Sequence, residues 1–188
     1  LKSSGEYDNT YIFFYADHGG PFPRHKRAIY ETGTKVPLII KPPKGVVINN
    51  NPFNLLSFID LAPTVLSIAG IDIPDHIQGT AFLGDQKRES PKLLFSASDR
   101  FDEQVDRLRA VFDGQYKYIK SYDSSKPHAI PVTYRLQMPM MQELLKLLKE
   151  DKLNEKQKFW FNAPKPSEEF YDLKNDPYEL NNLINDPN

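Results

Sequence analysis

The chain contains no cysteine among its 188 residues, which excludes a disulfide framework, a thiolate metal site and a cysteine nucleophile within it. No run of apolar residues approaches the roughly 18 that a membrane span requires. Its 24 basic and 25 acidic residues give a formal net charge of −1, without a long block of one sign. The chain therefore lacks the charge excess that general binding to nucleic acid or to a membrane surface needs.

The first part of the chain combines short apolar runs with one helix. Residues 10–16 form a continuous aromatic and aliphatic run, which predicts a buried parallel strand, and residues 36–40 and 54–59 predict two more strands. Residues 61–69 predict a helix, because Asp60 can cap it, Pro63 falls in its first turn and Gly70 follows its end. Two or three strands followed by a helix predict the edge of an α/β sheet.

The second part has shorter strands joined by tight turns. Strands are expected at 93–96, 109–112, 116–121 and 170–173, and helices at 140–149 and after Asn154. We expect Tyr116 and Tyr118 to lie in the core. The predicted fold class is α/β, with a first domain over residues 1–80 and a small antiparallel sheet with a covering helix over residues 81–188.

Asp17 and His18 directly follow the first predicted strand, where Gly19 and Gly20 let the backbone turn. A carboxylate suits a hard cation such as Ca²⁺ or Mg²⁺, and an imidazole shifts the preference toward Mn²⁺ or Zn²⁺. Two ligands do not complete a metal site, so the others would lie outside this chain. The alternative is an aspartate that caps a turn beside a hydrogen-bonded histidine.

A basic stretch follows this pair. The ammonium group of Lys26 suits an oxyanion, and Arg24 and His25 add further donors. The alternative is a solvated basic surface.

A second polar group surrounds Arg100, which suits a bidentate grip on a carboxylate or contact with sugar hydroxyls. It also contains Asp99, Asp102 and Glu103. These residues could equally form salt bridges with neighbouring arginines.

Together these segments resemble type I sulfatases, which belong to the alkaline phosphatase superfamily. The similarity rests on the order Asp17-His18-Gly19, Lys26, then residues 30–37 (YETGTKVP), the helix sequence at 60–66 and the tail at 169–183. The tail and the segment 99–103 (DRFDE) are most similar to the heparan N-sulfatase-like branch.

The resemblance implies the C-terminal portion of a sulfatase that hydrolyses sulfate esters or the N-sulfate of a sulfated, glycosaminoglycan-like carbohydrate. The fold would be the edge of an alkaline-phosphatase-like sheet followed by a small C-terminal subdomain. Asp17 and His18 would bind the divalent metal, usually Ca²⁺ in this family, with Mn²⁺ or Zn²⁺ left open. Lys26 would be catalytic and contact the sulfate, with His25, Arg24 and Arg100 as further candidates for substrate binding.

The family's nucleophile is a formylglycine made from Cys or Ser in a Cys/Ser-x-Pro-x-Arg motif, and this motif is absent here. We therefore expect the formylglycine in a missing N-terminal part of the same protein, and we expect this fragment alone to be inactive. The resemblance also implies a periplasmic, secreted or lysosomal-type location.

Two alternatives stay open: a phosphonate or phosphodiester hydrolase of the same superfamily, and a non-catalytic domain that binds sulfated glycan. A threonine nucleophile upstream would favour the first, and a basic cleft with no room for a metal at Asp17 would favour the second.

Overall fold

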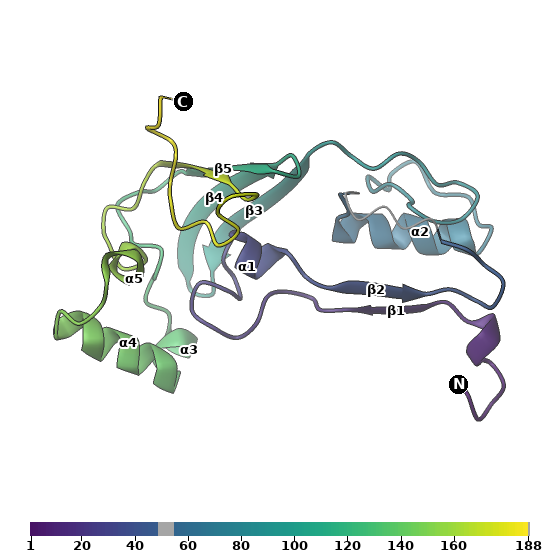
Figure 1. The fold of residues 1–188 in the computed structure, drawn as a ribbon, viewed down its shortest axis with the longest axis horizontal. Helices are drawn as coiled ribbons and strands as arrows, with labels where there is room; N and C mark the ends of the chain where they lie inside the picture. The colour runs from purple at the N-terminus through teal and green to yellow at the C-terminus, as the bar shows by residue number, and fades with distance from the viewer. Residues whose placement is uncertain (49–54, 188) are drawn as a thin grey trace. The chain divides into compact units, whose positions relative to one another are not determined.

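The structure, a computed structural model, describes residues 1–48 and 55–187, and the chain forms two compact units (Figure 1). The first unit comprises Leu1–Ala16 and Pro37–Leu94, and the second comprises Asp17–Val36 and Phe95–Asn188. The predicted domain boundaries, 1–80 and 81–188, describe how this chain would divide between the domains of the complete protein. They stay a prediction. The segment with the candidate site residues 17–26 belongs to the second unit.

The first unit contains a two-stranded antiparallel sheet. β1 (Ile12–Tyr15) pairs with β2 (Leu38–Lys41), with Ile12 opposite Lys41 and Tyr15 opposite Leu38. The prediction of a buried parallel strand at 10–16 is therefore wrong in direction, because an apolar run does not fix strand direction. It is also wrong in burial, since Phe14 is 65% exposed and Tyr15 is 45% exposed. A short 3-10 turn, η1 (Tyr7–Asn9), precedes β1.

The helix of the first unit, α2 (Leu61–Ile68), lies where it was predicted, with Pro63 buried in its first turn and Gly70 in the left-handed region at φ 67°. The predicted side-chain cap by Asp60 is wrong, because the Asp60 side chain makes no capping hydrogen bond to α2. The predicted strand 54–59 is wrong where it can be compared: residues 55–57 have no regular structure, and a 3-10 turn, η2 (Phe58–Asp60), follows. Position 54 lies outside the described residues. The reason is the Asp60 carboxylate, which accepts hydrogen bonds from the backbone N–H of Ser57 (2.8 Å) and of Thr80 (2.7 Å) and so bends the chain into the helix.

The second unit is built on a four-stranded sheet in the order β3-β4-β5-β6, which confirms the predicted antiparallel sheet. The strands are β3 (Leu94–Phe101), β4 (Gln104–Phe112), β5 (Tyr116–Ser121) and β6 (Glu168–Asp172), of which only Leu94 falls in the first unit. A turn at Asp113-Gly114 joins β4 to β5, and Gly114 has the positive φ (103°) that such turns require. β3 and β4 are longer than expected and meet at a two-residue turn in which Asp102 has φ 52°.

β5 buries the opposite face from the one we expected. Tyr116 is 41% exposed and Tyr118 is half-buried, whereas Lys117, Ile119 and Ser121 are buried. The expectation that both tyrosines lie in the core is therefore wrong. The physical cause is an ion pair, because the Lys117 ammonium is neutralised inside the protein by Glu31 at 2.6 Å.

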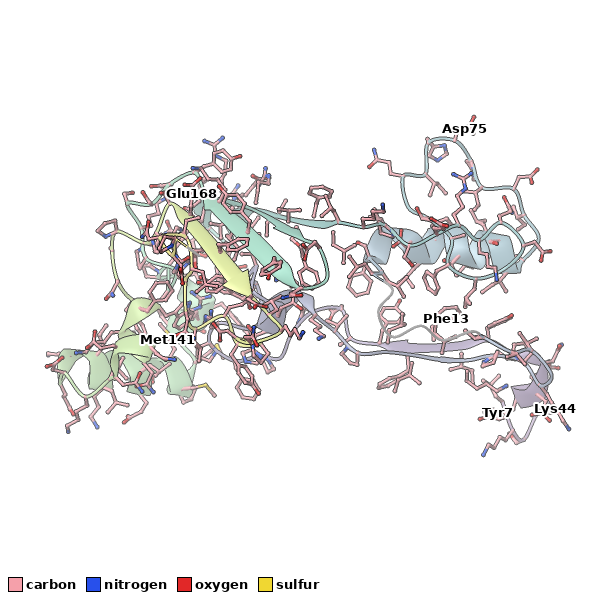
Figure 2. The ribbon with its side chains drawn as sticks, turned by 45° about the horizontal axis from the view of Figure 1, so that its top comes forward. Tyr7, Phe13, Lys44, Asp75, Met141 and Glu168 are labelled. Atoms are coloured by element: carbon pink, nitrogen blue, oxygen red, sulfur yellow. The ribbon has the colours of Figure 1, made fainter. Side chains whose placement is uncertain are left out.

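Short helices complete the second unit: α1 (Glu31–Thr34), α3 (Thr133–Leu136), α4 (Pro139–Lys149) and α5 (Glu155–Phe159). α5 begins after Asn154, whose side chain accepts a hydrogen bond from the backbone N–H of Gln157, as predicted. Met141 lies on α4 (Figure 2) and packs with Ala129 and Trp160.

The main apolar cluster of the second unit lies between the sheet and the loop before α1. It contains Ile29, Tyr30, Leu108, Ala110, Ile119 and Tyr171. The loop that carries the candidate site is thus fixed to the sheet through its last residues. Within residues 1–48 and 55–187, no helix has the length and apolar character that crossing a membrane would need.

Candidate functional site

The segment 17–36, a loop that leads into the short helix α1, folds back on itself at three glycines. The backbone N–H of Gly19 donates to the carbonyl of Gly33 (3.0 Å), and that of Lys26 donates to the carbonyl of Gly20 (3.0 Å). A side chain at Gly19 or Gly33 would collide with backbone, because a Cβ would lie 1.9 Å from the oxygen of Thr32 at Gly19 and 2.1 Å from the oxygen of Ala28 at Gly33. This close packing brings Lys26 back toward the residues that follow β1.

Asp17 and His18 present two acceptor atoms close together. His18 Nδ1 lies 2.7 Å from the carbonyl oxygen of Gly19, which can only accept, so this nitrogen carries the proton. In the neutral ring Nε2 is then a lone-pair donor to metals, and it lies 3.5 Å from Oδ1 of Asp17. Two such acceptors side by side repel each other unless a proton or a cation lies between them.

This arrangement fits part of a metal site. The Asp17 side chain is 84% exposed and that of His18 is 38% exposed, so both are accessible. Among the residues that the structure describes, no three His, Cys, Asp or Glu side chains are grouped so that they could hold an ion. That the remaining ligands lie outside this chain stays a prediction.

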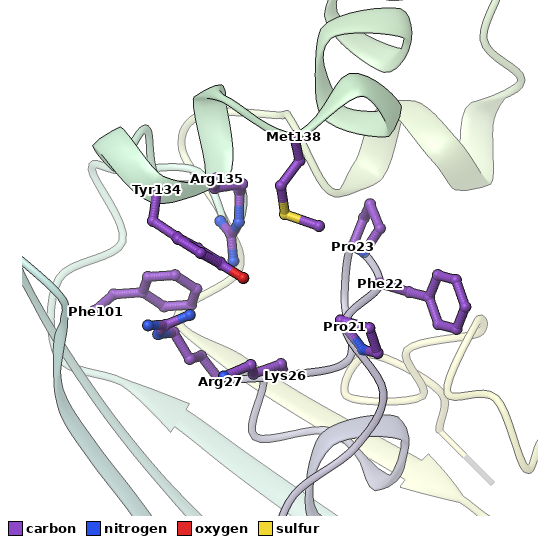
Figure 3. Close-up of a pocket in the computed structure, with 9 residues that line it drawn as sticks. All are labelled: Pro21, Phe22, Pro23, Lys26, Arg27, Phe101, Tyr134, Arg135 and Met138. Carbon is purple, nitrogen blue, oxygen red and sulfur yellow. The ribbon is translucent and has the colours of Figure 1, made fainter.

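Lys26 borders a small pocket in the second unit (Figure 3). Its ammonium has no carboxylate within 4.0 Å in the described part of the chain, so its charge is available to an anion. His25, its neighbour, packs its ring edge-to-face on Phe22, with 5.5 Å between ring centroids.

Arg24 is engaged with the C-terminal tail. Its two terminal nitrogens donate to the carbonyl oxygens of Tyr178 (2.6 Å) and Glu179 (2.6 Å), and its guanidinium lies 3.9 Å from the centre of the Tyr30 ring. Contact between Arg24 and a substrate would have to compete with these bonds. Substrate binding by Arg24 stays a prediction.

We expect Arg24→Met to destabilise the protein. The variant keeps the length of the side chain but loses two charge-assisted hydrogen bonds, which should cost about 2–3 kcal/mol of unfolding free energy. Chemical denaturation of the complete protein measures this value. Lys35→Met, at an exposed position of the same unit, is the matched control, and equal stability of both variants would show that the clamp on the tail is unimportant.

Arg100 is exposed on β3. Within the described residues, no hydrogen bond or ion pair links its side chain to the loop that carries Lys26. Its acidic neighbours have their own partners: Asp99 pairs with Arg109 (2.8 Å), and Asp102 pairs with Arg27 (2.7 Å). The carboxylate of Glu103 accepts from the backbone N–H of Thr133 (2.7 Å), which lowers the Glu103 pKa. The three carboxylates of this segment therefore form ion pairs or hydrogen bonds within the protein, which was the alternative to substrate binding. The exposed Arg100 side chain can still reach a ligand.

Two other charged residues of the pocket, Arg27 and Arg135, were not predicted from the sequence as site residues. Arg27 follows Lys26 directly, and Arg135 comes from α3, more than a hundred residues later. Arg27 could have been found from its place in the basic stretch. Nothing in the sequence around Arg135 distinguishes it from an ordinary helix residue.

Behind the loop lies a buried polar cluster. Glu169 accepts hydrogen bonds from the hydroxyls of Tyr30 (2.7 Å) and Tyr171 (2.5 Å), and His128 Nε2 lies 3.2 Å from the Tyr30 oxygen. Burial, reinforced by the charges of Lys165 and Arg24, lowers the pKa of His128 to about 3. Burial also raises the pKa of Glu169. The histidine is therefore neutral at physiological pH.

The neutral histidine predicts acid sensitivity. Between pH 6.5 and about 3 the unfolded chain binds a proton at His128 that the folded protein refuses, so folding stability falls as pH falls through this window. Because Glu169 has a raised pKa, it contributes the opposite slope. The comparison with His128→Gln isolates the histidine: the variant's stability should fall less steeply on acidification, by about 1.4 kcal/mol per pH unit. Urea titrations from pH 4 to 8 test this, and parallel curves would contradict it.

The chain matches known sulfatases over its whole length. Residues 22–131 match the family described as N-sulphoglucosamine sulphohydrolase, C-terminal. An ulvan-active sulfatase of Formosa agariphila is 47% identical over 187 residues, which cover all of this chain and 31% of that protein. The human N-acetylglucosamine-6-sulfatase is 45% identical over 78 residues, 39% of this chain and 14% of that protein.

Solved structures share the fold. A 2-O GAG sulfatase superposes with a TM-score of 0.63 at 23% identity, over 96% of this chain and 33% of that one. A protein in complex with its substrate, D-glucosamine-2-N,6-O-disulfate, superposes with a TM-score of 0.60 at 24% identity, over 99% of this chain and 32% of that one. The chain spans about a third of the length of these proteins, and it belongs to the N-sulphoglucosamine sulphohydrolase C-terminal family of sulfatases.

Proposed function

We propose that the complete protein is a sulfatase that removes a sulfate group from a sulfated carbohydrate, and that this chain supplies two metal ligands and one cationic contact. The observation that carries the proposal is the pair of acceptor atoms on Asp17 and His18, at the start of the loop that holds Lys26. Membership of the family supports the same function.

Each residue has a separate role. The carbonyl of Gly19 holds His18 in the tautomer whose Nε2 is free to coordinate, and Asp17 adds the negative charge that favours a divalent cation, for which we propose Ca²⁺. Such a cation supplies Lewis-acid stabilisation of charge on the sulfate oxygens. Lys26 places a second positive charge near that anion, where it stabilises the transition state more than the substrate. The nucleophile, expected to be formylglycine, belongs to the part of the protein outside this chain.

The proposed substrate is an O- or N-sulfated sugar of a glycosaminoglycan-like carbohydrate. The names of two similar proteins support this class, since one is an N-acetylglucosamine-6-sulfatase and the other a 2-O GAG sulfatase. Hydrolysis would release inorganic sulfate and leave a hydroxyl or an amine on the sugar.

Ion chromatography of inorganic sulfate tests the proposal. The complete protein, incubated with glucosamine carrying one O-sulfate or one N-sulfate, should release sulfate, whereas the isolated 188-residue chain should release none. Cleavage of an aryl phosphodiester in preference to both sugars would favour the phosphodiester hydrolase. Tight sugar binding without any release would favour a glycan-binding domain.

A further inference from the structure

The pocket beside Lys26 carries more positive charge than its surroundings neutralise (Figure 3). The residues that matter here are Lys26, Arg27, Phe101, Tyr134, Arg135 and Met138, which we call the basic pocket. Lys26 and Arg27 come from the loop before α1, Phe101 ends β3, and Tyr134 and Arg135 belong to α3. All of them lie in the second unit.

Three cationic side chains line the basic pocket, and only one of them, that of Arg27, forms an ion pair with a carboxylate among the described residues. Asp102 pairs with a single nitrogen of Arg27, Nη2, at 2.7 Å. Within the described residues neither Lys26 nor Arg135 forms an ion pair. Positive charges gathered around a concave surface without matching carboxylates raise the local concentration of anions.

Arg135 is the most constrained of the three. It is 7% exposed, its guanidinium lies 4.0 Å from the centre of the Phe101 ring and 4.9 Å from Trp160, and its Nη1 donates to the carbonyl of Ile130 (3.1 Å). Burial, and then the charge of Arg27, lower the pKa of Arg135 to about 10, so it remains charged at neutral pH. A buried cation without a carboxylate partner is costly, and an anion bound in the pocket would remove that cost.

The basic pocket is also preorganised. Arg135 is fixed between two aromatic rings, and Arg27 is held by Asp102 with a left-handed backbone at φ 68°. Figure 3 shows the hydroxyl of Tyr134 pointing into the pocket, where it can donate to or accept from a ligand. Because these side chains are already ordered, a ligand loses little binding energy in arranging them.

We propose that the basic pocket binds a second anionic group, a carboxylate or a sulfate, on a sugar next to the one that loses its sulfate. The guanidinium groups match the planar oxygens of a carboxylate or the oxygens of a sulfate, and the exposed ring of Tyr134 suits the apolar face of a pyranose. This inference rests on the proposed function and adds a preference for substrates with more than one negative charge.

Matched disaccharides test the pocket in the complete protein. One pair carries the same cleavable sulfate with a neighbouring carboxylate or its reduced alcohol, and the other pair carries or lacks a neighbouring second sulfate. The KM should be about ten- to a hundredfold lower for the charged member of one pair, and the pair that shows this identifies the anion. In Arg27→Gln and Arg135→Gln, the ratio of the KM values for the uncharged and the charged disaccharide should fall toward one. The control is Arg88→Gln, which changes an exposed arginine of the first unit and should keep the ratio unchanged.

The proposal would be overturned if the unmodified protein had the same KM for the charged and the uncharged disaccharide. It would also be overturned if Arg27→Gln preferred the charged disaccharide as strongly as the unmodified protein does. Circular dichroism shows whether Arg135→Gln folds, and if it does not, Arg27→Gln decides alone. Calorimetry separates this inference from the proposed function, because binding of the charged disaccharide needs no turnover. If no sulfate is released from any substrate, the proposed function fails, whereas charge-dependent binding that Arg27→Gln weakens would still support the pocket.

Discussion

Asp17→Ala in the complete protein is expected to abolish nearly all sulfatase activity together with the bound metal, a larger loss than Lys26→Ala. Removing the carboxylate takes away both a ligand and the negative charge that retains a divalent cation, so the whole Lewis-acid contribution is lost. Lys26→Ala removes one contact to the anion while the metal stays, which should cost about 3–4 kcal/mol in kcat/KM.

Metal content by mass spectrometry and kcat/KM, measured on the same preparations, decide between these roles. Asp75→Ala is the matched control, because Asp75 is an exposed aspartate of the first unit (Figure 2) and should leave both quantities unchanged. Both site variants should fold, since Asp17 is exposed and Lys26 lies in a loop. If Asp17→Ala kept its metal and its activity, the turn-capping alternative for Asp17 would be correct.

Lys165→Met is expected to lower the unfolding free energy by about 3–5 kcal/mol. The Lys165 ammonium lies 2.5 Å from Oδ1 of Asp106 on β4, and both side chains are buried. The substitution leaves the Asp106 carboxylate inside the protein without a cation, and the cost of that isolated charge accounts for most of the loss.

The double variant Asp106→Leu/Lys165→Met separates the charge from the packing. It removes both charges and keeps apolar volume, so it should recover most of the stability that Lys165→Met loses. Guanidinium titrations of the three proteins measure the coupling. A double variant as unstable as the single one would mean that shape, not charge, holds this part of the sheet.

The sequence predicted the elements whose signals are local. The α2 helix has Pro63 and Gly70 at its ends, and the β4–β5 turn has its Asp-Gly pair, so each is fixed by residues a few positions apart. The prediction of a strand at 54–59 was wrong because the Asp60 carboxylate accepts hydrogen bonds from the backbone N–H groups of Ser57 and Thr80. Thr80 lies 20 residues away, so a local sequence pattern cannot reveal this contact. Burial of Lys117 could not be predicted, since its partner Glu31 lies 86 residues away.

The same distinction applies to the site. Asp17, His18 and Lys26 lie in one short segment with recognisable spacing, so the sequence brings them together. The basic pocket draws Arg135 and Tyr134 from α3, and only the fold shows that they lie beside Lys26 and Arg27. Arg24 looked like a surface donor because its partners are carbonyls of the tail, which any residue type supplies.

The link between Arg24 and Glu179 also bears on the order in which the protein acquires its structure. Arg24 donates to the Glu179 carbonyl 155 residues later, and the Glu179 carboxylate accepts from the backbone N–H of Glu31 at 2.7 Å. A ribosome adds about 5–20 residues per second, so the tail is made roughly 8–30 s after the loop. During that interval the segment that carries Lys26 lacks two of its anchors. Its final conformation is therefore reached only after the tail around Glu179 has been synthesised.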